Sequence, residues 1–172
     1  MRKVEVVPYN HQWPQMFEDE ASKIKTIMNE IMVEIDHIGS TSIPGMSAKP
    51  VIDILVEVNS IEKVDSYNQE MMDLGYDPKG ENGIPNRRYF SKGGDNRTHH
   101  VHIFQSGNPE IARHLQFRDY LTAHLEDANS YSELKQSLAK QYPADIEQYI
   151  LGKDKLVKEL DEKAKLWGQR MV

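Results

Sequence analysis

The residues best suited to chemistry are Gly39-Ser40-Thr41-Ser42, followed by Lys49 and then by Asp53 within an apolar run. Glycine lets the backbone approach a bound group closely, and neighbouring hydroxyls and backbone amides can hold phosphate oxygens. Lys49 adds a positive charge, and Asp53 could fasten a divalent metal ion that holds the same phosphates. The segment predicts an anion site, with a nucleotide as the expected ligand.

A second group of functional residues lies in Arg97-Thr-His-His-Val-His-Ile103. Strand side chains alternate between faces, so Val101 and Ile103 are expected in the core while His100 and His102 point together to the other side. Adjacent histidines on one face can ligate a metal, transfer a proton or bind phosphate when protonated. A solvated strand face, or two histidines that merely form hydrogen bonds, is an open alternative.

These groups need a framework of strands and helices to position them. Apolar spacing predicts an amphipathic helix, two core strands on either side of the polar loop, a second helix that begins at Ser60 and ends at Gly75, and then a β-hairpin. The corresponding ranges are about 13–30, 33–38, 51–58, 60–75, 87–91 with 98–104, and a helical remainder from about residue 109. The pattern indicates an α/β protein with a helical C-terminal part.

Composition limits the classes of function. A chain of 172 residues fits one domain, and the lack of cysteine excludes disulfides and thiol nucleophiles and fits a cytoplasmic location. No apolar run approaches the roughly 20 residues that span a bilayer, so no membrane partner is expected. The formal net charge of -6 disfavours extended nucleic acid as a partner. A homo-oligomer stays open.

Several spaced motifs resemble the GrpB family, which is placed in the nucleotidyltransferase superfamily. They are Gly39-Ser-Thr-Ser-Ile-Pro-Gly45, Ala48-Lys-Pro50, Ile52-Asp-Ile54, Arg97-Thr-His-His-Val-His102 and His114-Leu-Gln-Phe-Arg-Asp-Tyr-Leu121. The resemblance runs nearly end to end and implies one domain over 1–172, with an α/β (α+β) core to about residue 107 and a helical tail from about 108. It also implies a nucleotidyltransferase-like mixed β-sheet flanked by helices.

The resemblance assigns roles to some of these residues. In the superfamily pattern a glycine-serine turn binds the triphosphate, and two acids separated by one residue hold two magnesium ions. Gly39, Ser40 and Asp53 match, whereas Leu55 stands at the second acid position and cannot bind a cation. His100 and His102 could complete a metal site with Asp53, since imidazole suits zinc or manganese better than magnesium.

Other basic residues are candidates for contacts with the ligand. Besides Lys49, we predict Arg88, Arg97 and Arg118 as substrate-binding residues, although Arg118 could equally form an ion pair that orients two elements. Alternation permits only one residue of the pair 87–88 to face the site. Lys153 and the other lysines of the last helix are expected on a solvated face, and so is Lys135 unless the tail folds over the pocket.

The expected function is that of a nucleotidyltransferase-like protein whose Gly39–Ser42 turn binds a nucleotide or another phosphorylated small molecule. Asp53, His100 and His102 are its predicted catalytic residues and the predicted ligands of a divalent metal, Mg, Mn or Zn. No organic cofactor is indicated. The alternatives are a binding module without catalysis and a metal-dependent hydrolase built from the same three residues.

Overall fold

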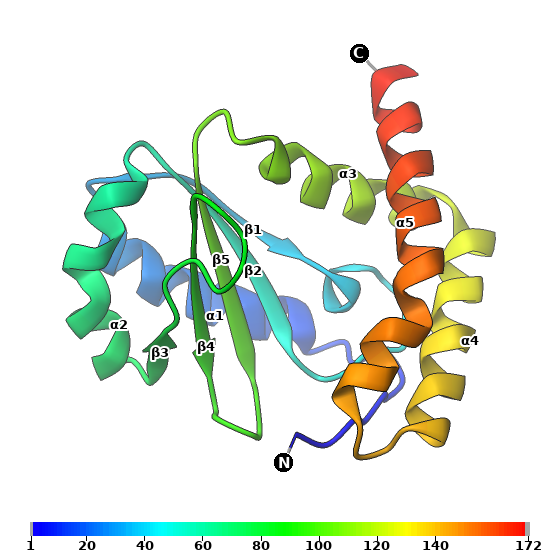
Figure 1. Cartoon of the computed structure of the whole chain (residues 1–172). Helices are drawn as coiled ribbons and strands as arrows, with labels where there is room; N and C mark the ends of the chain where they lie inside the picture. The colour runs from blue at the N-terminus through cyan, green and yellow to red at the C-terminus, as the bar shows by residue number, and fades with distance from the viewer. Residues whose placement is uncertain (1, 171–172) are drawn as a thin grey trace.

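The computed structural model describes residues 2–170, which form one five-stranded mixed sheet with helices on both faces (Figure 1). The strand order is β1-β2-β5-β4-β3, where β2 and β5 are parallel and the other neighbours are antiparallel. The strands are β1 (Met32–Ile38), β2 (Ile52–Val58), β3 (Tyr76–Pro78), β4 (Arg87–Lys92) and β5 (His99–Gln105). The mixed sheet flanked by helices confirms the predicted fold class.

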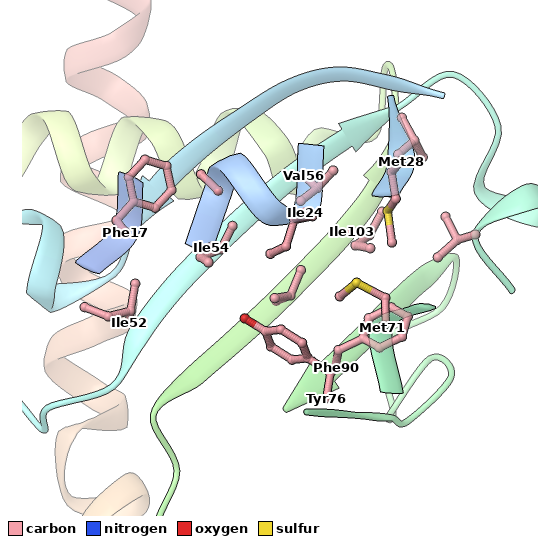
Figure 2. Close-up of a cluster of buried hydrophobic side chains, with 14 of the residues drawn as sticks. Phe17, Ile24, Met28, Ile52, Ile54, Val56, Met71, Tyr76, Phe90 and Ile103 are labelled. Atoms are coloured by element: carbon pink, nitrogen blue, oxygen red, sulfur yellow. The ribbon is translucent and has the colours of Figure 1, made fainter. Parts of the chain in front are cut away.

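One face of the sheet carries the main hydrophobic core (Figure 2). Helix α1 (Trp13–Met28) and the short α2 (Asn68–Asp73) cover this face, and α1 inserts Phe17, Ile24 and Met28. Strands β2 and β5 bury their alternate residues here, Val101 and Ile103 among them, as the sequence predicts. Period-2 alternation sends the intervening residues of both strands to the opposite face.

The opposite face is covered by the helical tail, which consists of α3 (Pro109–Ala123), α4 (Leu125–Gln141) and α5 (Ile146–Arg170). Helix α5 packs against both α3 and α4 (Figure 1). Asn108 caps α3 by accepting a hydrogen bond from the backbone N–H of Glu110, and Pro109 supplies the fixed φ that suits the first helical position. No helix within residues 2–170 is long and apolar enough to cross a membrane.

Most predicted helices and strands are present, with ends within a few residues of the predicted ones. The exception is the segment after Ser60. The segment Ile61–Tyr67 is a 3-10 helix that becomes α-helical only over α2, and the side chain of Ser60 forms no cap hydrogen bond. The prediction of one continuous helix with a serine cap is therefore wrong. Asp65, in this 3-10 helix, instead forms an ion pair with Arg88 of β4.

Candidate functional site

The glycine-hydroxyl segment forms a tight turn between β1 and β2. Gly39 has φ +73° and ψ −173°, and Ser40–Ser42 form a single 3-10 turn after it. This backbone region is essentially restricted to glycine. A Cβ at Gly39 would lie 2.6 Å from Oδ2 of Asp53, so glycine here permits the close approach of the turn to the acid. Within the turn, the hydroxyl of Ser42 donates to the Gly39 carbonyl.

Strand pairing brings Asp53 beside the two histidines. Asp53 of β2 is in register with His100 of β5, and both strands run parallel, so the side chains of Asp53, His100 and His102 share one face. Oδ1 of Asp53 lies 3.2 Å from Nε2 of His102 and 3.4 Å from Nδ1 of His100. The structure thus brings together the three residues that the sequence singled out as catalytic.

Two arginines fix the tautomers of these histidines. Nη1 of Arg97 lies 3.3 Å from Nε2 of His100, and Nη1 of Arg87 lies 3.3 Å from Nδ1 of His102. A guanidinium can only donate, so the ring nitrogens that face the arginines accept. In the neutral rings the protonated nitrogens therefore face Asp53, and both point their N–H toward its carboxylate.

The electrostatics of the cluster agree with this pattern. Burial raises the pKa of Asp53, but contacts from His100 and His102 outweigh burial and hold this pKa well below the usual range of a carboxyl. Burial lowers the pKa of His100, which favours the neutral ring despite the neighbouring acid. The site thus holds an anionic Asp53 beside neutral His100.

This arrangement does not fit a metal ion. A metal ligand must offer a lone pair, whereas the nitrogens of His100 and His102 nearest Asp53 carry protons in the hydrogen-bond network above. The second acid position is filled by Leu55, which is buried with Ile38 and Phe104. Among residues 2–170 no group of three or more His, Asp or Glu side chains is placed to hold a metal ion. The binding of Mg, Mn or Zn at this site therefore stays a prediction. The hydrogen bonds of His100 and His102 do not favour it.

A pocket of about 350 Å³ opens in front of Asp53, between the turn and the helical tail. Its charged lining consists of Arg2, Lys49, Asp53, Lys135 and Lys153, so Asp53 is the one carboxylate among the lining residues described. His100 and the turn residues Ser40 and Thr41 also line it. Four basic side chains against one acid make this pocket suited to an anion.

Lys135 is the unusual member of this lining. It lies on α4 with 1% of its surface exposed, and its Nζ has no hydrogen-bond partner within the described chain. The ammonium lies 4.3 Å from the centre of the Tyr131 ring. Burial, with smaller contributions from Lys153 and Lys49, lowers the pKa of Lys135 to about 6. Burial also lowers the pKa of Lys49, to about 8.

The other predicted ligand-binding residues lie in different places. Arg97 lines a neighbouring hollow with Lys49, while Gly39 borders a second cavity of about 230 Å³ against α3 and α5. Arg118 forms an ion pair with Asp36 at 3.6 Å and donates to the backbone carbonyl of His37, which joins α3 to β1. These contacts agree with the alternative that Arg118 forms an ion pair that orients two elements.

The prediction for Arg88 is wrong. Arg88 pairs across the strands with Ile103, on the core side of β4, and its guanidinium binds Asp65 with a shortest distance of 2.8 Å. Arg87 is the arginine that faces the histidines, through its contact with His102. Alternation predicts that only one of the two arginines faces the site, and that residue is Arg87 and not the predicted Arg88.

Lys135 was expected on a solvated face unless the tail folds over the pocket, and the tail does fold over it, so Lys135 is buried. Lys153, expected on an exposed face, is half-buried and lines the same pocket. A signal for Lys135 exists in the sequence. It lies four residues after Tyr131 and three before Leu138, both buried, so it falls on the apolar stripe of α4. A lysine on such a stripe indicates a buried ammonium.

Comparisons with known proteins agree with this fold. The family model "GrpB protein" matches residues 3–163. The UPF0157 protein YqkA of Bacillus subtilis (strain 168) is 54% identical over 96% of this chain, which spans 48% of YqkA, about half its length. The glutamate-rich protein GrpB of Alkalihalophilus pseudofirmus is 34% identical over 92% of this chain and 94% of its own.

Solved structures extend the comparison. The conserved protein GrpB from Enterococcus faecalis superposes with a TM-score of 0.91 at 44% identity, over 95% of this chain and 99% of that one. The Cid1 poly(U) polymerase, with Mg 3'-dATP bound, superposes with a TM-score of 0.55 at 13% identity over 78% of this chain and 43% of its own. The second likeness concerns the fold alone, which is nucleotidyltransferase-like. With its family model matched nearly end to end, this chain belongs to the GrpB family.

Proposed function

We propose that this protein binds a nucleotide or another phosphorylated small molecule, with the phosphates lying against the Ser40–Thr41 hydroxyls and the lysines of the pocket. The observation that carries the proposal is Lys135, a buried lysine without a hydrogen-bond partner in the described structure that lines this pocket. A buried amine left without a partner destabilises a fold, so a site that keeps one is suited to an anion that completes it.

The neighbouring groups support the same ligand class. Lys49 and Lys153 flank the Tyr149 ring, with their ammonium groups 5.2 Å and 5.0 Å from its centre. Tyr149 lines the same pocket, so both ammonium groups lie near one another at its ring. The positive charges of these lysines repel one another and disfavour the charged form of Lys135, and a polyphosphate would relieve that repulsion. A single carboxylate ligand would offset less of the charge.

The direct test is calorimetric titration of the protein with ATP, inorganic tripolyphosphate and AMP, alongside thermal unfolding. A ligand that binds only the folded state raises the melting temperature, and the rise grows with the ratio of ligand concentration to dissociation constant. We expect ATP and tripolyphosphate to bind and to stabilise the protein, and AMP to bind more weakly because it carries fewer charges. If none of these probes gives a heat signal or a thermal shift, the proposal is defeated.

Nucleotidyl transfer is the second candidate function. It is favoured by the nucleotidyltransferase-like fold and by Asp53, which faces the pocket from β2. Because Leu55 replaces the second acid, the metal-assisted route lacks one of its usual carboxylates. Pyrophosphate release from ATP, measured for the parent protein and for Asp53→Ala, tests this candidate. Turnover that vanishes in the variant would favour transfer over simple binding.

Ligand binding should be linked to proton uptake. At pH 8 Lys135, with its pKa lowered to about 6, is largely neutral, and an anion beside it favours the charged form and raises this pKa. Binding of tripolyphosphate at pH 8 is therefore expected to take up protons, and the affinity should fall as the pH rises from 6 to 9. Calorimetry in buffers of different ionisation enthalpy measures the uptake. Proton release, or an affinity that rises with pH, would contradict it.

The same lysine predicts the pH dependence of the free protein. Its pKa is lower in the folded state than the ordinary 10.5, so the unfolded chain binds more protons between about pH 6 and pH 10.5. The contribution of Lys135 to the free energy of unfolding therefore rises with pH across this window. Urea unfolding from pH 6 to pH 9, compared between the parent protein and Lys135→Met, isolates this contribution. A difference between the two proteins that stays constant with pH would contradict the shift.

A further inference from the structure

We infer that the pocket neutralises the phosphates of its ligand with lysine ammonium groups in place of a divalent metal, so that Mg²⁺ weakens binding instead of promoting it. This inference rests on the proposed function and specifies the ionic form of the ligand. A nucleoside triphosphate free of metal carries more negative charge than its magnesium complex. The pocket is suited to the metal-free form.

The first observation concerns the strand that carries Asp53. Leu55, the next residue on the same face of β2, is 1% exposed and packs with Ile38 and Phe104 in a hydrophobic cluster. Ile111 and Leu115 of α3 close this cluster from above. An acid could not replace Leu55 without burying a charge among apolar side chains. The position next to Asp53 on this face of β2 therefore offers no second carboxylate, where two metal ions would need a closely spaced pair.

The second observation concerns the histidines. Arg97 and Arg87 occupy the accepting nitrogens of His100 and His102, and the remaining nitrogens direct their protons at Asp53. To ligate a metal next to Asp53, both rings would have to change tautomer and lose their arginine contacts. One carboxylate oxygen of Asp53 is likewise engaged, since Oδ1 faces both rings. The contacts with the arginines and with Asp53 thus occupy both nitrogens of each ring.

The third observation concerns the positive charges that could neutralise the phosphates. Lys49, Lys135 and Lys153 line the pocket together with Arg2, and the buried Lys135 lacks a hydrogen-bond partner among residues 2–170. Burial lowers the pKa values of Lys49 and Lys135, and repulsion from Lys153 lowers both further. A magnesium ion added to this group would increase that repulsion, whereas bare phosphate oxygens remove it. Charge alone therefore favours the metal-free anion.

The experiment is a calorimetric titration of the full chain with ATP and with tripolyphosphate, in EDTA and at increasing Mg²⁺. We expect the dissociation constant for ATP to increase about threefold or more between EDTA and saturating Mg²⁺, because the magnesium complex carries less negative charge. Equal or tighter binding with Mg²⁺ overturns the inference. If no probe binds under any condition, the proposed function itself fails, so the two failures are distinguishable.

Two variants separate lysine neutralisation from a metal role for Asp53. Asp53→Asn removes a negative charge from the pocket, so ATP in EDTA should bind about twofold or more tighter. At saturating Mg²⁺ a metal-dependent site would instead lose binding in this variant. Asp77→Asn, on the exposed edge strand β3, is the matched control and should change nothing. Titration with Zn²⁺, Mn²⁺ or Mg²⁺ alone completes the test. A stoichiometric metal site that Asp53→Asn removes would overturn the inference without any nucleotide.

Discussion

Replacement of Lys135 by methionine is expected to make the free protein more stable and to remove its affinity for phosphate. Methionine keeps the unbranched shape and most of the length of the side chain on α4 but leaves no amine buried without a hydrogen-bond partner. Such a buried polar group typically costs about 1–3 kcal/mol, so the free energy of unfolding should rise by about that amount. Affinity for tripolyphosphate should fall at least about tenfold, because charge-assisted hydrogen bonds are worth about 1.5–3 kcal/mol.

The opposite signs of these two effects make the result specific. Urea unfolding measures stability, and calorimetry with tripolyphosphate measures binding. Lys140→Met, an exposed lysine on the same helix, is the matched control and should alter neither quantity by more than about 0.5 kcal/mol. A Lys135→Met protein that is destabilised, or that binds tripolyphosphate as the parent does, would show that Lys135 has a structural role instead.

Gly39→Ala is expected to destabilise the protein strongly and to disrupt the Asp53 cluster. Two penalties combine at this position: the backbone has φ +73°, and the new Cβ would lie 2.6 Å from Oδ2 of Asp53. Backbone strain of this kind costs about 1–3 kcal/mol, and overpacking adds about 1–3 kcal/mol. The carboxylate must move to admit the methyl group, so the hydrogen bond with His102 should be lost.

Gly45→Ala separates the two penalties. Gly45 has φ +80° at the other end of the same polar segment, but a Cβ there would meet nothing within 4 Å. This control should lose only the strain, about 1 kcal/mol, and should keep its affinity for phosphate. Urea unfolding and NMR of the histidine ring nitrogens report the two effects. If both variants lose equal stability and keep the His102 signal, the close approach of Gly39 to Asp53 has no energetic role.

Much of this architecture could be predicted from local patterns. The alternation in His100-Val-His102 indicated that both histidines share a face, and in the structure both lie beside Asp53. The helix at Trp13–Met28 and the hairpin strands β4 and β5 were also predictable from periodicity. The helix, the strands and the shared face of the histidines depend only on the spacing of residues within one element, which can be read directly from the sequence.

Features that depend on pairing between distant elements were not predictable in this way. Alternation could not decide between Arg87 and Arg88, because the face that each occupies depends on the register of β4 against β5. The 3-10 segment after Ser60 depends similarly on contacts with β4 and β5. Local propensity competes with such tertiary contacts, and here it led to the wrong prediction that Ser60 caps a continuous helix.

The sequence by itself was enough to identify the turn, the acid and the two histidines as candidate functional residues. The types and spacing of glycine, hydroxyl, carboxylate and imidazole groups indicate which chemistry they can perform. Tertiary structure alone decided the charge of the pocket. The tail folds back so that Lys135 and Lys153 join Lys49 from residues about a hundred positions away, and burial then lowers the pKa of Lys135. The tertiary structure also places Arg87 and Arg97 against ring nitrogens of His102 and His100. Charge and protonation depend on which groups meet in space and how much water remains, and neither can be read from spacing along the chain.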